Sequence, residues 1–304
     1  MTAMNPDQSR KEFAHRHEFF IGIDSDGTVF DNMGIKHREC FCPWIIGYFG
    51  LQPVAQAARE CLEFADLFSR TRGANRHKSL VHILTNLLPS HPAVKARGFK
   101  VPRFPYYFAW ADDPSSVLSG AGLEQAIAEA SGPAREELEL VLAWNQRVDW
   151  AVEQIVRGIP PFPPVRACLE KMQGKADMTV ISTAPCETLA RDWTEPGLAG
   201  YVAMLAGQEM GTKAQYLEYA AKDRYDRGHV LMIGDSPGDW EAAKTNDALF
   251  YPILPDDEEA SWKRFHDEVL DKFFNGTYAG RYEEELIDEF DARLPERPPW
   301  ETRL

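Results

Sequence analysis

Short apolar runs at intervals along the chain predict buried β-strands. The five runs occupy residues 19–24, 178–183, 201–207, 229–235 and 248–254. None of them alternates cleanly between apolar and polar residues, which is typical of parallel strands that helices cover on both faces. Stretches with helical features lie between the later runs, at 164–172, 212–221 and 239–244. Because strands and helices alternate along the chain, the sequence predicts an α/β fold with a doubly wound parallel sheet.

The first strand is separated from the second by more than 150 residues, far more than an ordinary crossover connection. Within that interval, residues 53–68 and 133–156 place apolar side chains on one face of a helix. The run GIPPFPP at 158–164 is typical of a stiff linker, because proline fixes φ and interrupts helices. The interval therefore predicts an inserted, mostly α-helical domain that returns to the sheet through this linker.

These features divide the chain into a discontinuous core, residues 1–32 and 161–304, and an inserted domain, residues 33–160. The core is expected to end in a C-terminal helical extension that begins near residue 256. Two helices are expected there, at 258–274 and 282–294, before a proline-rich end. The aromatic content of this extension favours packing on the core.

The balance of charges narrows the possible partners. Lysine and arginine number 33 and aspartate and glutamate 47, a formal net charge of −14. Such a surface repels nucleic acid, whereas a small anion can still bind where a metal ion and local cations reverse the potential. No apolar run approaches the roughly 18 residues of a membrane helix, and the polar N-terminus does not resemble a signal peptide. Five cysteines, an odd number, do not suggest a disulfide framework. We therefore expect a cytoplasmic protein with neither nucleic acid nor membrane as partner; the oligomeric state is left open.

The first candidate for chemistry is IGIDSDGTVFD at residues 21–31. Asp24 ends an apolar strand, so its carboxylate is expected at the carboxyl edge of the sheet, where open α/β sheets bind ligands. Asp26 lies two residues later. Of two such neighbouring acids, one can act as a nucleophile or metal ligand while the other transfers protons. Gly27 allows the sharp turn that this arrangement needs. Taken alone, the segment could also be a solvated Asp-Gly turn.

A second candidate, IGDSPGD at residues 233–239, also ends an apolar strand. Asp235 at the strand end and Asp239 at the start of the next helix can face one cleft. Carboxylates gathered there repel one another unless a cation holds them, so the two motifs together predict a hard divalent ion. Taken alone, Asp239 is more simply explained as a helix cap.

Together, DxDGT at one strand end and GDxxxD at a later one resemble the haloacid dehalogenase superfamily, in its phosphatase branch. The resemblance implies two further motifs. Ser182, near the end of the second strand, fits one of them, with Thr183 as the fallback. Lys213 fits the other, with Lys222 as the weaker candidate. The four motifs occur in the family's order and cover the core.

The resemblance also implies roles for these residues. Asp24 would attack phosphorus and form an aspartyl-phosphate, while Asp26 would protonate the leaving oxygen and then activate water. Mg²⁺ would be held by the Asp24 carboxylate, the Asp26 backbone carbonyl and Asp235, with Asp239 supporting the metal shell or orienting the lysine. A metal and a lysine are needed because a carboxylate cannot otherwise approach a dianionic phosphomonoester.

Phosphate contacts are expected from Ser182 and Lys213, with Thr183 as the alternative to the serine and the backbone amide of Thr28 as a further contact. The presence of Asp26 favours phosphate-ester hydrolysis or phosphoryl transfer, since the family's dehalogenase and phosphonate-cleaving branches lack an acid at this position.

The insertion lies where one class of this family carries a helical cap, which excludes water and selects the leaving group. Arg72 and Arg76, in the cationic stretch 70–78, are candidates for binding a second anionic group of the substrate; the alternative is a solvated helix face. The implied substrate is a small phosphorylated metabolite, cleaved with the help of Mg²⁺. A phosphomutase on the same fold and a catalytically silent binding protein are the alternatives.

Overall fold

The computed structural model describes residues 14–302. The chain forms two compact units. The core unit comprises the chain up to Asn32 together with Gly158–Arg293, and the cap unit comprises Met33–Arg157 together with the segment that begins at Leu294. The first 13 residues of the polar N-terminal stretch lie outside the described residues.

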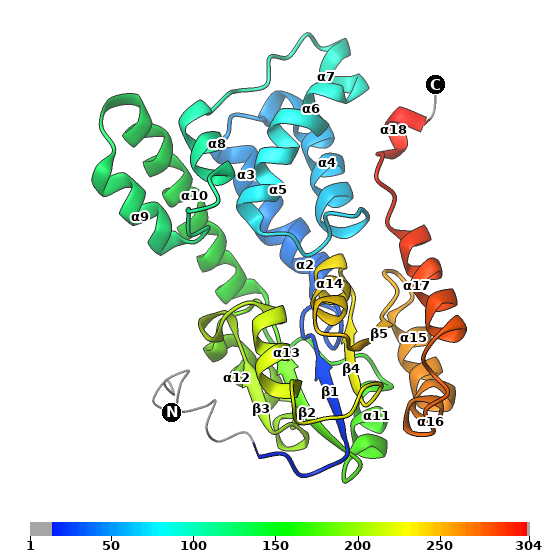
Figure 1. The fold of residues 1–304 in the computed structure, drawn as a ribbon. Coiled ribbons are helices and arrows are strands. Elements are labelled where there is room, and N and C mark those ends of the chain that lie inside the picture. Colours follow the sequence, from blue (N-terminus) through cyan, green and yellow to red (C-terminus); the bar gives the residue numbers. More distant parts are fainter. Residues whose placement is uncertain (1–13, 303–304) are drawn as a thin grey trace. The chain divides into compact units, whose positions relative to one another are not determined.

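The core unit is built on a five-stranded, all-parallel sheet (Figure 1). Its strands are β1 Phe19–Ile23, β2 Ala176–Ile181, β3 Met204–Ala206, β4 Val230–Gly234 and β5 Leu249–Pro252. Their order is β3-β2-β1-β4-β5, so the chain winds outward on one side of β1 and then on the other. The doubly wound parallel sheet expected from the sequence is thereby confirmed. In such sheets ligands bind at the carboxyl ends of the strands where the winding reverses, here β1 and β4.

Helices cover both faces of this sheet. They are α11 Val165–Met172, α12 Cys186–Thr194, α13 Lys213–Ala221, α14 Pro237–Thr245, α15 Glu258–Arg264, α16 Leu270–Phe274 and α17 Arg281–Arg293. Phe19, Ile21 and Ile23 of β1 point to one face and share a buried apolar cluster with α11, α12, α15 and α16. Helices α13, α14 and α17 contact strands as well, and Phe290 of α17 packs against Phe250 of β5. Coverage on both faces explains why the strand sequences do not alternate.

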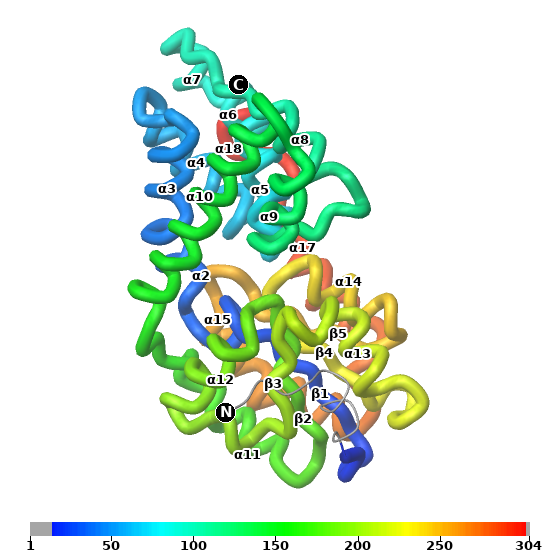
Figure 2. Tube along the Cα trace, turned by 90° about the vertical axis from the view of Figure 1, so that its left-hand side faces the viewer, coloured from blue at the N-terminus to red at the C-terminus, as the bar shows by residue number. Residues whose placement is uncertain are grey.

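The cap unit is mostly helical, as expected for the insertion. Its α-helices are α2 Met33–Ile35, α3 Cys42–Tyr48, α4 Ala55–Leu67, α5 Arg76–His82, α6 Leu88–Ser90, α7 Pro92–Ala96, α8 Pro105–Asp112, α9 Gly120–Glu129, α10 Gly132–Ile155 and α18 Pro299–Thr302. The long helix α10 packs against α3, α8 and α9 (Figure 2). It buries Leu138, Val141, Trp144 and Val148, and this spacing of three or four residues forms one apolar stripe.

The C-terminal extension is divided between the two units, which differs from the expected core of 161–304. Its helices α15 to α17 belong to the core unit, but residues 294–302 group with the cap unit. There the ring of Trp300 lies 5.7 Å from that of Phe64 and 4.8 Å from that of His91, measured between centroids. The aromatic content favoured packing on the core, which holds for α15 to α17 but not for residues 294–302. A local pattern carries no information about which distant helices bury a segment.

Candidate functional site

The carboxyl end of β1 leads into a tight turn that carries three of the expected site residues. The backbone N–H of Asp24 donates to the carbonyl of Ile233 in β4 at 2.9 Å, which ties the two strand ends together. Gly27 has a φ of 74°, a left-handed conformation that glycine adopts without steric cost. The hydroxyl of Thr28 lies 2.9 Å from Asp235 Oδ1 and 3.3 Å from Asp24 Oδ2, so it donates into the space between the two carboxylates.

Asp235 follows β4 directly, and Asp239 lies in the first turn of α14. Asp239 forms a capping box with Ser236, since its Oδ2 accepts from the Ser236 backbone N–H at 3.1 Å and from the hydroxyl at 2.6 Å. Gly234 makes this approach possible, because a Cβ there would stand 2.3 Å from Asp239 Cγ. Asp239 therefore takes part in capping α14, as the N3 residue of a box whose N-cap is Ser236, and its Oδ1 is left for a second partner.

Lys213, the first residue of α13, supplies that partner. Its Nζ lies 2.6 Å from Asp239 Oδ1 and 2.8 Å from Asp24 Oδ1. One carboxylate oxygen from each of Asp24, Asp235 and Asp239 lies within 4.8 Å of the other two. The structure thus brings together side chains that directly follow β1 and β4 and that lie in the first turns of α13 and α14, up to 215 positions apart in the chain.

Burial governs the charges in this cluster. Asp24, Asp235 and Asp239 are all buried, at 4%, 2% and 0% exposure. Burial raises the pKa of Asp24 well above its ordinary value; the ammonium of Lys213 opposes this effect, and the carboxylates of Asp239 and Asp235 add to it. Burial by itself lowers the pKa of Lys213, but the carboxylates of Asp239 and Asp24 outweigh it and hold that pKa above its ordinary value.

The donor set fits a hard divalent cation. Three buried carboxylates face a single ammonium group, so the cluster has negative charge in excess. Carboxylate oxygens are the ligands that hard cations such as Mg²⁺ and Ca²⁺ prefer. Because Asp239 already accepts from Lys213 and Ser236, the oxygens of Asp24 and Asp235 are the better placed to bind an ion.

Asp26 lies in a different environment from Asp24. Its side chain is half-buried, and its Oδ1 accepts from Nδ2 of Asn32. The same Asn32 accepts from the Gly27 backbone N–H through its Oδ1 at 3.1 Å, so it holds the turn and the second acid together. Sequence reasoning missed Asn32. The only signal was its position directly after the first motif.

Of the two residues considered for the second motif, Ser182 is buried and Thr183 is exposed. Ser182 follows β2, and its Oγ accepts from the Ala184 N–H at 3.2 Å. Because β1 and β2 pair Ile23 with Val180, Ser182 stands at the same edge of the sheet as Asp24. Phosphate binding by Ser182 or Thr183 stays a prediction.

Three cationic candidates have other partners. Lys222 is exposed and lies 2.6 Å from Glu218, so Lys213 is the lysine that reaches the cluster. Arg72 is buried and donates to the carbonyl of Leu67 at 2.8 Å. Arg76 forms an ion pair with Asp149 in α10. Both arginines thus make contacts inside the cap unit, and their binding of substrate stays a prediction.

Two tryptophans hold the turn after β1 from the side of the core. The indole N–H of Trp193 in α12 donates to Ser25 Oγ at 3.0 Å, and that of Trp262 in α15 donates to the Thr28 carbonyl at 2.7 Å. Both rings are fully buried. These contacts span 168 and 234 positions, so no local pattern could have indicated them.

None of the helices in residues 14–302 is both long and apolar enough to cross a bilayer. No family model matches the chain, and no curated protein matches it.

Several solved structures resemble the chain at low identity. A protein from Haemophilus somnus described as a predicted phosphoglycolate phosphatase is 15% identical, with 80% of this chain and 88% of that one covered and a TM-score of 0.46. A haloacid dehalogenase-like family hydrolase from Streptococcus pneumoniae is 13% identical, with 84% and 98% covered and a TM-score of 0.43. A magnesium-bound hydrolase from Bacillus subtilis is 12% identical, with 78% and 87% covered and a TM-score of 0.37. Two of these three structures, those from Streptococcus pneumoniae and Bacillus subtilis, are described as hydrolases of the haloacid dehalogenase type.

Proposed function

We propose that this protein is a magnesium-dependent phosphohydrolase of the haloacid dehalogenase type, which cleaves a small phosphomonoester through an aspartyl-phosphate on Asp24. The observation that carries the proposal is the convergence of Asp24, Asp235, Asp239 and Lys213 at the carboxyl ends of β1 and β4. A buried carboxylate beside a lysine, with further carboxylates that need a cation, suits attack on an anionic phosphoryl group.

In the first step, an oxygen of Asp24 attacks phosphorus and the bond between phosphorus and the leaving oxygen breaks. Lys213, 2.8 Å from Asp24 Oδ1, orients the nucleophile and balances charge on the phosphoryl oxygens. Asp239 fixes the ammonium from the other side at 2.6 Å. Thr28 restrains Asp24 and Asp235 through its hydroxyl.

Asp26 supplies and then removes a proton. In its acid form it protonates the leaving alkoxide, and the resulting carboxylate then accepts a proton from the water that attacks the aspartyl-phosphate. The products are the alcohol, inorganic phosphate and free Asp24. The hydrogen bond from Asn32 holds the Asp26 carboxyl in one orientation for both transfers.

Mg²⁺ would be held by the carboxylates of Asp24 and Asp235 and the backbone carbonyl of Asp26. When bound it would supply positive charge against the phosphoryl oxygens.

The test is hydrolysis of p-nitrophenyl phosphate, with released phosphate measured directly. Turnover is expected with Mg²⁺, lost in EDTA and restored by excess Mg²⁺. The variant Asp24→Asn should lose turnover entirely while remaining folded by circular dichroism. The matched control is Asp31→Asn, an exposed acid on the same segment, which should keep wild-type turnover.

Equal rates in EDTA and in Mg²⁺ would refute the metal assignment. Wild-type turnover by Asp24→Asn would refute the nucleophile.

A further inference from the structure

One stretch of the cap unit differs sharply in charge from the rest of the chain. Residues 67–111 contain eight lysines and arginines and no aspartate or glutamate, in a protein that has 47 acidic residues among 304. At the average frequency of the chain, a segment of this length would hold roughly seven acids. An acid-free stretch in so acidic a protein favours a site for a negatively charged ligand.

The first four of these cations are used within the cap unit. Arg76 pairs with Asp149 and Lys78 with Asp112, while Arg70 lies 3.7 Å from Glu296. Arg72 is buried against a backbone carbonyl. Acids from other segments therefore neutralise much of this half of the stretch.

The second half is different. Its cations are Lys95, Arg97, Lys100 and Arg103, and all four are exposed. Within residues 14–302, no carboxylate lies in ion-pair distance of any of them. Their charge is therefore free to act on a ligand.

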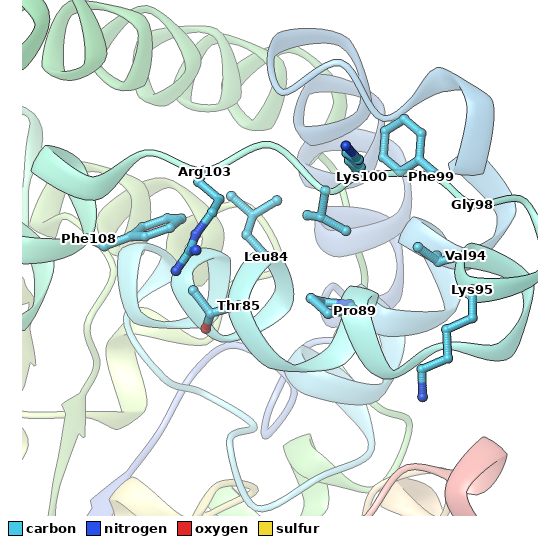
Figure 3. Close-up of a pocket in the computed structure, with 11 residues that line it drawn as sticks. Leu84, Thr85, Pro89, Val94, Lys95, Gly98, Phe99, Lys100, Arg103 and Phe108 are labelled. Atoms are coloured by element: carbon cyan, nitrogen blue, oxygen red, sulfur yellow. The ribbon is translucent and has the colours of Figure 1, made fainter.

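Three of these four line a single pocket of about 430 Å³ (Figure 3). This volume falls in the range of small-molecule sites, roughly 300–1,000 Å³. In Figure 3, Arg103 lies beside Phe108 and Thr85 on the left of the pocket, and Lys95 lies on the right. Lys100 is the third cation.

The remaining walls of the pocket are mostly apolar. They include Leu84, Pro89, Val94, Phe99 and Phe108. A pocket of this kind suits a molecule that has an apolar body and a charged end, because apolar walls bury the body and the cations orient the charge. Inorganic phosphate alone would leave the apolar surface unused.

We propose that this pocket of the cap unit binds an organic phosphate that carries an aromatic ring, such as a nucleotide, with the ring against the apolar walls that include Phe99 and Phe108. All the residues that line the pocket lie between Leu84 and Phe108, and none belongs to the carboxylate cluster of the core unit. The proposal does not rest on the phosphohydrolase function.

The test is isothermal titration calorimetry of the full chain with ADP, adenosine and inorganic phosphate at low ionic strength. EDTA is present throughout, so the carboxylate cluster lacks a cation and repels anions. ADP should bind, with adenosine and phosphate each at least about tenfold weaker, a difference of about 1.4 kcal/mol. Raising the salt concentration should weaken ADP binding.

The variant Lys95→Gln/Lys100→Gln/Arg103→Gln should weaken ADP binding about tenfold or more. These side chains are exposed, so the variant is expected to fold. The matched control is Arg135→Gln/Arg157→Gln/Arg281→Gln, which removes the same charge from exposed sites outside the pocket and should bind ADP within about twofold of wild type.

ADP binding no tighter than adenosine binding, or unchanged in the pocket variant, would overturn the proposal. So would a single-stranded oligonucleotide that binds more tightly than ADP and depends on the same three residues. Hydrolysis of p-nitrophenyl phosphate with Mg²⁺ is measured separately, so a failure of this proposal is distinguishable from a failure of the proposed function.

Discussion

The two acids of the first motif have the same chemistry but different surroundings. Asp24 is buried and paired with Lys213, whereas Asp26 is half-buried and bonded to the neutral amide of Asn32. A carboxylate held by an ammonium group is kept in place as a nucleophile. A more accessible one with a neutral partner is better suited to carry a proton in and out.

Asp26→Asn tests this division of work. The change should lower kcat by roughly 10²- to 10⁴-fold for an alkyl phosphate, because a poor leaving group needs a proton. The loss should be smaller for p-nitrophenyl phosphate in a single turnover, since its leaving group is stable as an anion. Equal losses for the two substrates in the step that releases the alcohol would contradict an acid role for Asp26.

His77 gives a prediction for pH at the scale of one residue. It is fully buried in the cap unit, and burial, with Arg76 beside it, lowers the pKa of His77 to about 3. In the unfolded chain the imidazole of His77 takes up a proton near pH 6.5, whereas in the folded chain it stays neutral until about pH 3. The contribution of His77 to the free energy of unfolding is therefore fully present above pH 6.5. It falls as pH decreases from 6.5 toward 3, by at most about 1.4 kcal/mol per pH unit.

Urea unfolding at pH 7.5 and 5.0 measures this effect. His77→Phe should flatten the loss of stability between the two values, whereas His15→Gln, at an exposed site, should leave it unchanged. An identical loss in wild type and His77→Phe would show that His77 stays uncharged in both states or charged in both.

At the scale of elements, the site depends on helices that are distant in sequence. The turn after β1 is held by an indole N–H from α12 and another from α15, through Trp193 and Trp262. Helix α15, in the C-terminal part of the core unit, thus helps to position the turn that follows Asp24. It is not merely an addition to the sheet.

Trp262→Phe keeps an aromatic ring but removes the donor to the Thr28 carbonyl. The free energy of unfolding should fall by about 2–4 kcal/mol, from an unsatisfied carbonyl and a partly empty cavity. Catalysis should weaken too, because Thr28 contacts both Asp24 and Asp235. The exposed Trp150→Phe serves as the control. A loss of stability with unchanged kcat would show that Trp262 stabilises the fold but does not affect catalysis.

The elements that the sequence predicts well are those with a strong local pattern. All five strands occur within a few residues of the apolar runs, and α10 follows its apolar stripe. The third strand, Met204–Ala206, is shorter than the expected 201–207, since Tyr201 belongs to the 3-10 helix Ala199–Tyr201 and residues 202, 203 and 207 lie outside the strand. Helix α12 was not predicted, since CETLARDWT gives few apolar positions over a short length.

The candidate site could be predicted only in part. Asp24, Asp26, Asp235 and Asp239 stand at strand ends and helix starts, which a local pattern identifies. The support from Asn32 and the two tryptophans could not be found, because it depends on which distant helices pack on the turn. The pocket of the cap unit was missed as well, since the expected cationic contacts were placed at residues 70–78.

At the scale of the whole molecule, the chain passes between its two units three times, after Asn32, after Arg157 and after Arg293. The cap unit is therefore completed by the C-terminus, whose Trp300 packs on Phe64 and His91. Deleting the last residues is expected to weaken the cap unit.

Trp300→Ala tests whether the C-terminal segment stabilises the cap unit. It should destabilise the cap unit by about 1–3 kcal/mol, because a half-buried aromatic side chain and its two ring contacts are lost. Hydrogen exchange, followed peptide by peptide, should show faster exchange in α4 and around His91. Trp150→Ala, at a 50% exposed site of α10, should change stability by less than about 0.5 kcal/mol. Equal effects of the two variants would contradict the role given to Trp300.

The proposed reaction requires Asp24 to accept the phosphoryl group. Mass spectrometry of the enzyme, quenched in acid during turnover of an aryl phosphate with Mg²⁺ and digested at low pH, tests it most directly. One added phosphate is expected on the peptide that contains Asp24, and it should be absent in EDTA and in Asp24→Asn. Phosphate on another residue, or undiminished phosphorylation of Asp24→Asn, would contradict it.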